Sequence, residues 1–506
     1  MFLVIELVLG VLVGYTVGRV IWWIVRHYVR VEVSPFRYRL LWTILGALFV
    51  AITIIGIHQH NALSDMVHMP RLTTTQFVRT YLTTGVILAG LYLIARLWGR
   101  LFTALQQRFR WFAKAWWIAV SIIVLGLSAL VLSGVFGNRL YQYYQGSYAA
   151  AQARTDEGIS PTTDTLRSGS ASSLVSWQNL GRQGRNFIGS GPDAVTISKV
   201  THRSAKQPIR VYVGVESAST AAERARIAVQ ELERTDAFSR RILVVMTPSG
   251  SGWIEPELAD SVEYVHGGDT AIVTTQYAYV PSWVVSTFKQ DLATESGQAL
   301  FAAIYAKWST LPQEARPKLY VCGLSLGSYG MQAAFTSTSD VLQKTDGAMF
   351  SGTPSFTPLW SEVVSQRVQG STMGAPRFPA ASEVRFAANR TELSDPLSKN
   401  TRIIYTQHGS DPTVWWNPQT IFRKPTWMDE VRPSDQSPRM RWFPVVTFTK
   451  LTIDQFLGLD PEKGFGHNYQ NTHTRAWLSL GVPDADWRED TTRAVEQQLG
   501  IKPDAP

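Results

Sequence analysis

The chain has 506 residues, more than a single domain usually holds, so two or more folding units are expected. Hydrophobic residues make up 45% of the chain and charged residues 17%, which excludes an intrinsically disordered protein. The single cysteine, Cys322, excludes an intrachain disulfide and any metal site built from several cysteines.

The net charge of +9 arises almost entirely from the first part of the chain. The first 150 residues hold 13 Lys and Arg against 3 acidic residues, whereas the remainder holds 35 against 36. A basic protein can bind nucleic acid, but these arginines lie between long apolar segments instead of on one polar face. We therefore expect no nucleic-acid partner and interpret the charge as a signal of membrane topology.

Four apolar segments follow one another at the start of the chain. They cover about residues 2–25, 40–57, 81–98 and 116–136, and a helix needs roughly 20 residues to cross a bilayer. The first is too long for a signal peptide and lacks a cleavage motif. The second is near the lower length limit, so a buried helix is the alternative there. The sequence predicts a transmembrane domain of four helices at residues 1–137, with the lipid bilayer as its partner.

The loops between these segments differ in charge, which predicts their orientation. Cytoplasmic loops collect Lys and Arg, so the first and third loops are expected inside. Their basic residues are Arg26, Arg30, Arg37 and Arg39 in the first loop and Arg100, Arg108, Arg110 and Lys114 in the third. We expect a multi-pass cell-membrane protein whose part after residue 136 is extracytoplasmic.

Residues 138–185 are interpreted as a connector. Its start, LYQYYQGSYAAAQAR, suits an interfacial helix, and the Ser-, Thr- and Gly-rich sequence that follows is expected to be mobile.

Residues 186–506 alternate between apolar strand-like segments and amphipathic helical segments. The strands are expected at 209–216, 241–247, 270–280, 318–324, 347–352 and 401–409, with a last one at 445–450; helices are expected at 221–235 and 294–311. This alternation predicts a mostly parallel, doubly wound α/β sheet, which binds ligands at the carboxyl ends of its strands.

The segment GLSLG, residues 323–327, is a candidate for a nucleophile elbow. It lies between a predicted strand and a predicted helix, which is the context that this motif requires. Glycines at the two ends allow a sharp turn that exposes Ser325 above the sheet. The alternative is a Gly-rich turn with an inert serine.

A serine hydroxyl needs a base, and this arrangement orders its triad as Ser, acid, His along the chain. We select His467, which lies in a glycine-flanked loop after the predicted strand at 445–450, with His473 and His408 as rivals. For the acid we select Asp411, which directly follows the strand at 401–409. Its competitors are Asp429, Asp435 and Asp454, and the alternative role of Asp411 is to cap a turn.

Two backbone amides should stabilise the oxyanion of a tetrahedral intermediate. One is expected from Leu326 and the other from Gly250, Ser251 or Gly252 in a glycine-rich loop. Trp253, Trp415 and Trp416 are candidate pocket-lining residues, with core packing as the alternative. This chemistry requires no metal or cofactor, and no metal-binding motif is found.

The chain resembles the actinobacterial membrane-anchored α/β-hydrolases of the family 9 type, in which a multi-helix membrane region precedes a hydrolase domain. The resemblance covers most of the chain. It rests on the segments GRNFIGSGP (184–192), TPSGSGWIEP (247–256), GLSLGSYG (323–330), QHGSDPTVWW (407–416), MRWFPVVTF (440–448) and GFGHNY (464–469). It implies Ser325 as nucleophile, Asp411 as acid and His467 as base, with residues 186–506 as the α/β-hydrolase domain. Phe465 departs from the family, where a second histidine is usual, so a base built from two histidines is not expected.

The resemblance implies an envelope-facing esterase, lipase or acyltransferase in a bacterium with a lipid-rich wall. The leading hypothesis is hydrolysis of an ester in a lipid or acylated envelope component through an acyl-enzyme. Acyl transfer to a sugar or lipid hydroxyl uses the same triad and is the main alternative. A non-catalytic sensor or scaffold is the third, because the fold alone does not fix a function.

Overall fold

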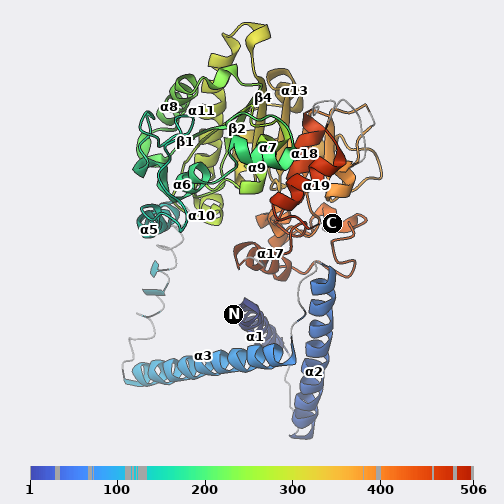
Figure 1. The fold of residues 1–506 in the computed structure, drawn as a ribbon. Helices are drawn as coiled ribbons and strands as arrows, with labels where there is room; N and C mark the ends of the chain where they lie inside the picture. Colours follow the sequence, from blue (N-terminus) through green and yellow to red (C-terminus); the bar gives the residue numbers. More distant parts are fainter. Residues whose placement is uncertain are drawn as a thin grey trace. The chain divides into compact units, whose positions relative to one another are not determined.

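The fold was analysed in a computed structural model of the chain (Figure 1). The residues that it describes are 2–28, 35–66, 71, 73–108, 116, 119–120, 122–123, 134–379, 381–394, 401–457, 461–481 and 487–502. They separate into two compact units. The first comprises residues 1–135 and 442–458, and the second comprises residues 136–441 and 459–506.

The first unit is helical where the structure describes it. Its helices are α1 (Phe2–Tyr28), α2 (Pro35–Met66), α3 (Thr74–Arg108) and α17 (Val446–Leu457). Helix α1 packs against both α3 and α17. The first three apolar segments of the sequence are therefore helices, as predicted, and each helix extends beyond its apolar segment.

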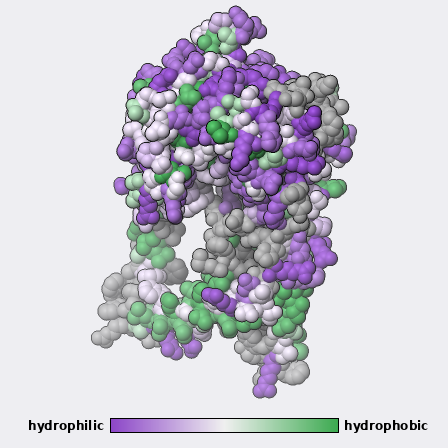
Figure 2. Space-filling model, viewed as in Figure 1, coloured by the Kyte–Doolittle hydropathy of each residue, from purple (hydrophilic) through white to green (hydrophobic). Residues whose placement is uncertain are grey.

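Among the described residues, one helix is long and apolar enough to span a membrane, over Thr74–Ala104 in α3. Only 11% of its most apolar stretch is buried, and Val86, Ile94 and Leu97 are 72%, 65% and 63% exposed. Figure 2 shows hydrophobic residues gathered over α3, whereas the surface of the sheet unit is mostly hydrophilic. Most of the fourth predicted segment, 116–136, lies outside the described residues, so the four-helix arrangement stays a prediction.

The second unit is built on one sheet of seven parallel strands. Their order is β1-β3-β2-β4-β5-β7-β6, and every pair is parallel. The strands are β1 (Ile209–Val213), β2 (Ile242–Thr247), β3 (Thr270–Thr275), β4 (Lys318–Leu324), β5 (Gly347–Ser351), β6 (Val384–Ala387) and β7 (Ile403–Thr406). The central strands are apolar along their whole length because helices cover both faces of the sheet. Six of the predicted strands are thus confirmed.

Helices form a layer on each face of this sheet. In one layer, α11 (Gln290–Ser309) packs against both α8 (Ala221–Arg234) and α12 (Leu326–Gln332). In the other, α9 (Pro256–Val265) packs against α18 (His473–Leu480) (Figure 1). Around them lie α5 (Val135–Gln152), α6 (Gly181–Gly189), α7 (Ala194–Thr201), α10 (Ser282–Phe288), α13 (Thr338–Lys344), α14 (Pro358–Ser365), α15 (Arg390–Ser394), α16 (Pro412–Trp415) and α19 (Glu489–Gln498).

Local sequence signals explain where helices begin. In α8, Thr220 and Glu223 form a reciprocal capping box, which satisfies two amides that the helix itself leaves without acceptors. Helices α9 and α14 each carry a proline in their first turn, where its missing N–H costs nothing.

Two predictions about secondary structure are wrong. The segment 445–450 begins helix α17 in the first unit instead of forming a strand. Its β-branched residues suggested a strand, but the hydroxyls of Thr449 and Thr452 bond to the carbonyls four residues earlier, which suits a helix. Strand β6 was not predicted, because it is short, half-buried and at the sheet edge.

The expectation of a mobile connector is also wrong. Arg167, Ser168 and Ser170 are buried, and the amide of Ser168 donates to the carbonyl of Arg210 in β1 at 3.0 Å. The side chain of Arg167 donates to carbonyls around α6, including that of Ile188 at 2.6 Å. Residues 138–185 therefore belong to the sheet unit, and several of their polar side chains bond to other protein groups.

Candidate active site

Ser325 occupies a sharp turn between β4 and α12. Its backbone has a φ of 58° and a ψ of −124°, a strained conformation for any residue other than glycine. Its amide donates to the carbonyl of Ser351 at the end of β5, at 2.8 Å. A Cβ atom on Gly327 would lie 2.2 Å from the carbonyl oxygen of Thr247, so only glycine fits there. The predicted strand–turn–helix context of Ser325 is confirmed.

Asp411 follows β7, separated from it by four residues, and caps α16. Its side chain is fully buried, and Oδ1 accepts from the amide of Thr413 at 2.8 Å. Oδ2 lies 2.7 Å from Nδ1 of His467 and also accepts from the Tyr469 hydroxyl at 2.7 Å. The turn-capping role and the contact with the histidine therefore occur together, because each uses a different carboxylate oxygen.

His467 lies in the loop before α18, with its side chain 32% exposed. Its ring packs against Gly352, where an added Cβ would lie 2.9 Å from Cε1. Gly352 follows Ser351, the residue whose carbonyl binds the Ser325 amide. The structure thus places the base candidate next to the turn that carries the nucleophile candidate. Within the described part of the chain the Ser325 hydroxyl makes no hydrogen bond to another side chain.

The pKa of His467 lies above its ordinary value. Burial lowers this pKa, but the charge and hydrogen bond of Asp411 raise it, and the charge of Glu255 adds to them. The Asp411 carboxylate, bound to Nδ1, fixes the tautomer in which Nδ1 carries a proton. The other ring nitrogen, Nε2, can then accept a proton.

The two rival histidines make different contacts. His408 is buried, stacks on Tyr469 with ring centroids 4.2 Å apart, and bonds through Nδ1 to the carbonyl of Gly466 at 2.8 Å. Burial lowers the pKa of His408. His473 is fully buried and bonds through Nε2 to Glu255. Among the described residues, neither of these imidazole rings bonds to the Asp411 carboxylate; His408 contacts Asp411 only through its carbonyl, which accepts from the Asp411 amide at 3.3 Å.

The rival carboxylates are engaged elsewhere. Asp435 accepts from the amide and hydroxyl of Ser410, both at 2.9 Å, and so fixes the loop that carries Asp411. Asp429 pairs with Lys424, and Asp454 pairs with Lys450. Tyr469 was not predicted as a site residue, and Asp435 was named only as a rival for the acid. Tyr469 lies two residues after His467 in the sequence, and this short spacing was the feature that could have indicated a role for it at the site.

The glycine-rich loop after β2 lies against the turn of Ser325. Ser249 donates its hydroxyl to the carbonyl of Leu324 at 2.8 Å. Gly252 donates its amide to the carbonyl of Ser249 at 2.9 Å, so this predicted oxyanion donor is already occupied. The amide of Gly250 interacts with the hydroxyl of Tyr277. Ser251 and Leu326, the first residue of α12, therefore carry the amides best suited to an oxyanion.

The predicted pocket tryptophans have different environments. Trp415 is only 2% exposed; its indole donates to the carbonyl of Gly409 at 2.8 Å and its ring packs on Trp427. The environment of Trp415 matches the core-packing alternative, because its polar atom and its ring are both used in the core. Trp253 is 37% exposed, and Trp416 is half-buried.

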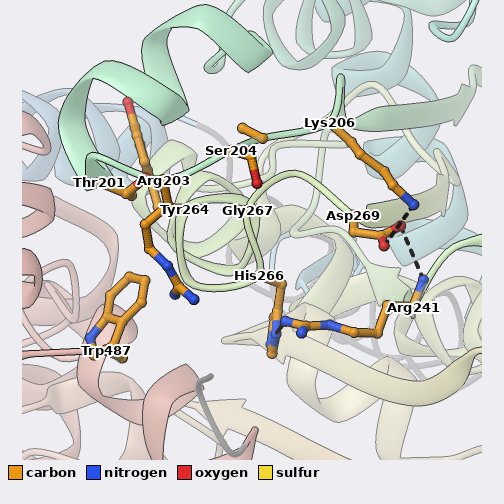
Figure 3. A pocket seen from close by; sticks show the side chains of 11 residues that line it. Thr201, Arg203, Ser204, Lys206, Arg241, Tyr264, His266, Gly267, Asp269 and Trp487 are labelled. Atoms are coloured by element: carbon orange, nitrogen blue, oxygen red, sulfur yellow. Dashed lines mark hydrogen bonds and ion pairs between the residues drawn. The ribbon is translucent and has the colours of Figure 1, made fainter. Parts of the chain in front are cut away.

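Two cavities of the sheet unit are lined by residues other than the candidate triad and these tryptophans. One of about 270 Å³ opens at the amino ends of β2 and β3. Ser325 follows the carboxyl end of β4, so it lies at the opposite ends of the strands. Figure 3 shows Lys206 paired with Asp269 on one side, Arg241 beside His266, and Trp487 across from them. Another, of about 900 Å³, lies beside β6. Among the described residues, no cluster of three or more His, Cys, Asp or Glu could hold a metal ion.

Two family models match the chain. A sequence model of the "Alpha/beta-hydrolase family" matches residues 209–495, and one of the "Alpha/beta-hydrolase family N-terminus" matches residues 5–192. An acetylxylan esterase structure is 16% identical over 34% of this chain and 84% of its own, with a TM-score of 0.23. A cutinase-like protein from Cryptococcus sp. is 10% identical over 52% of this chain and 98% of its own, with a TM-score of 0.22. No curated protein matches the chain.

Proposed function

The chain belongs to the α/β-hydrolase family, since the family's sequence model covers residues 209–495, and from this we propose that it is a membrane-associated serine esterase. The observation that carries the proposal is the contact between Asp411 and His467, at 2.7 Å, beside a strained turn that presents Ser325. Strain of this kind persists only where surrounding structure imposes it, and it is frequent at catalytic sites.

In the proposed acylation step, Ser325 Oγ attacks the ester carbonyl while His467 Nε2 takes the hydroxyl proton. The tetrahedral oxyanion is stabilised by the amides of Leu326 and Ser251. The carbon–oxygen bond to the alcohol then breaks, and His467 returns the proton to the departing alcohol. Asp411 stabilises the imidazolium that exists between the two proton transfers.

In the proposed deacylation step, His467 takes a proton from water, and the resulting hydroxide attacks the acyl carbonyl of Ser325. The acid leaves, and the proton returns to Ser325 Oγ. A sugar or lipid hydroxyl in place of water would give acyl transfer with the same residues, so product analysis decides between the two reactions.

We propose an ester in a lipid or an acylated envelope component as the substrate. The support is the apolar surface of α3: a helix with 11% burial of its most apolar stretch needs an apolar environment, which a bilayer supplies. A multi-pass anchor with an extracytoplasmic sheet unit follows from the charge of the loops and stays a proposal. A reporter fused to the C-terminus, active only outside the cytoplasm, would support it.

The esterase proposal is tested with a fluorophosphonate probe, which labels activated serines. Wild-type protein in membranes should be labelled, and Ser325→Ala should not. Asp411→Asn should lower the labelling rate by about 10³–10⁴-fold, because the imidazole loses its required tautomer. Ser339→Ala, which alters an exposed serine of α13, should label as wild type does. Labelling that persists in Ser325→Ala would contradict the proposal.

A further inference from the structure

A second buried pair of an acid and a histidine lies behind the candidate triad. His473 Nε2 bonds to Glu255 Oε2, although the two residues are 218 positions apart in the chain. Their side chains are 0% and 3% exposed, respectively. A buried carboxylate requires compensating partners, so an arrangement of this kind needs a reason.

The pair joins the two loops that the proposed reaction uses. Glu255 directly precedes α9 and ends the loop that begins at Ser249 and includes Ser251. His473 begins α18, six residues after His467. The two helices are packed together, since the Trp477 indole donates to the carbonyl of Leu258 at 3.0 Å. The hydrogen bond between Glu255 and His473 therefore fixes the oxyanion loop relative to the loop of the base.

The pair uses one nitrogen of the histidine ring. Nε2 of His473 bonds to Glu255 Oε2, and Nδ1 has no partner among the described residues. The charge of Glu255 acts on His467, whose pKa it raises.

We propose that Glu255 and His473 form a positioning pair, in which His473 holds the Glu255 carboxylate where its charge stabilises protonated His467. This inference rests on the proposed esterase function, because an imidazolium at His467 matters only if the residue is the base. Neither residue of the pair touches the reacting atoms, so both act through His467.

The groups around His467 differ in whether they carry a charge that can stabilise its protonated form. Asp411 bonds to Nδ1, the Tyr469 ring meets the imidazole edge-on with centroids 5.9 Å apart, and neutral His408 lies behind. Asp411 and Glu255 are the two groups whose charge raises the pKa of His467. The Glu255 charge also raises the pKa of the Cys322 thiol, in the strand that leads to Ser325, although burial contributes most to that rise.

The test follows the protonation of His467 directly. Diethyl pyrocarbonate modifies neutral imidazole, and the half-exposed ring of His467 is accessible to it. The rate of modification at residue 467 is read by peptide mass spectrometry across pH in the full-length protein. The pH at which this rate is half of its maximum is the midpoint of His467 protonation. In Glu255→Gln, which keeps a hydrogen-bonding partner for His473, the midpoint should fall by about 0.5 pH unit or more.

Two matched variants separate charge from structure. His473→Gln keeps both a donor and the Glu255 charge, so its midpoint should stay within about 0.2 pH unit of the wild-type value. Glu257→Gln makes the same chemical change in the first turn of α9, at a carboxylate that pairs with Lys463 at 3.0 Å. Its midpoint should also stay at the wild-type value. An unchanged midpoint in Glu255→Gln would overturn the proposal, as would equal shifts in Glu255→Gln and His473→Gln.

A double variant covers the case in which Glu255→Gln does not fold. Glu255→Met with His473→Leu removes the whole pair, and replacing a buried polar pair by apolar residues of similar size is often tolerated. Its midpoint should fall as in Glu255→Gln, and an unchanged midpoint would overturn the proposal. Because this readout needs no enzymatic turnover, it is independent of the probe experiment with Ser325→Ala, and the two proposals can fail separately.

Discussion

Tyr469 donates its hydroxyl to Oδ2 of Asp411 at 2.7 Å, the same oxygen that faces His467. The tyrosine is fully buried, and its hydroxyl also accepts from the amide of His408 at 3.2 Å. One carboxylate oxygen is therefore shared between a tyrosine and the base. Tyr469 holds the acid in place. Its hydroxyl also shares the acceptor oxygen with the imidazole, which weakens the hydrogen bond between Asp411 and His467.

Tyr469→Phe should test this sharing. Loss of the hydroxyl leaves the His408 amide without its acceptor and removes one donor from Asp411, so the free energy of unfolding should fall by about 1–2 kcal/mol. The fluorophosphonate labelling rate should change by less than about tenfold, because the contact between Asp411 and His467 remains. A loss as large as that of Asp411→Asn would show that Tyr469 is essential to the site itself.

Gly352→Ala should separate the geometry of the site from stability. The glycine has a φ of 54°, and an added Cβ would lie 2.8 Å from the Tyr469 ring and 2.9 Å from the His467 ring. We expect displacement of His467 and a loss of labelling rate of about 10²-fold. Gly370→Ala is the control, since its φ is 84° and nothing lies within 4 Å of the added Cβ. It should lower stability by about 1 kcal/mol through backbone strain and leave labelling unchanged.

Equal losses of labelling in the two glycine variants would contradict this account, because both substitutions strain the backbone and only one reaches the histidine.

Local signals account for what the sequence could predict about the site. Ser325 lies between a strand and a helix within a few residues, so its position depends on neighbouring sequence alone. Asp411 was selected because it follows a predicted strand, and His467 because it lies in a glycine-flanked loop at the expected place in the chain order. The structure brings the two side chains into contact. The resemblance to a family added to both selections.

The remaining features depend on distant parts of the chain. Glu255 and His473 meet only because α9 packs on α18, a contact that no local pattern encodes. Trp415 was predicted at a pocket because it follows the acid, yet its indole finds a backbone acceptor in the core. The connector resembled a mobile segment because its serines are polar, and its burial depends on partners such as Glu231, which accepts from Ser168 at 3.0 Å.

Ser325→Gly should stabilise the protein while it removes the nucleophile. The φ of 58° at Ser325 is costly for a residue with a Cβ atom and free of that cost for glycine. Ser325→Ala keeps the Cβ and so keeps the strain. In detergent, the free energy of unfolding of Ser325→Gly should therefore exceed that of Ser325→Ala by about 1 kcal/mol, although glycine gains more entropy on unfolding. Equal stabilities would mean that the turn stores no usable strain.

Buried His408 should make the sheet unit sensitive to acid. Burial lowers the pKa of His408 in the folded state, despite the opposing charge of Asp435 and the hydrogen bond to Gly466. In the unfolded chain its pKa is about 6.5, so the unfolded state binds the proton more readily. The stability that depends on neutral His408 is thus complete above about pH 6.5 and is lost as the pH falls below it. His467 acts in the opposite direction, because its folded-state pKa is raised: its contribution is complete below about pH 6.5 and is lost as the pH rises through the folded value.

Denaturant unfolding of wild type and His408→Gln at pH 7.5 and pH 5.5 measures the His408 contribution. Between pH 7.5 and pH 5.5 the free energy of unfolding of wild type should fall by about 1 kcal/mol more than that of His408→Gln, because the variant has no imidazole to protonate at this position. His202→Asn is the control, since His202 is exposed at the end of α7 with a φ of 55°, a conformation that asparagine tolerates. It should lose as much stability as wild type does. If His408→Gln also loses as much as wild type, the acid sensitivity arises from groups other than His408.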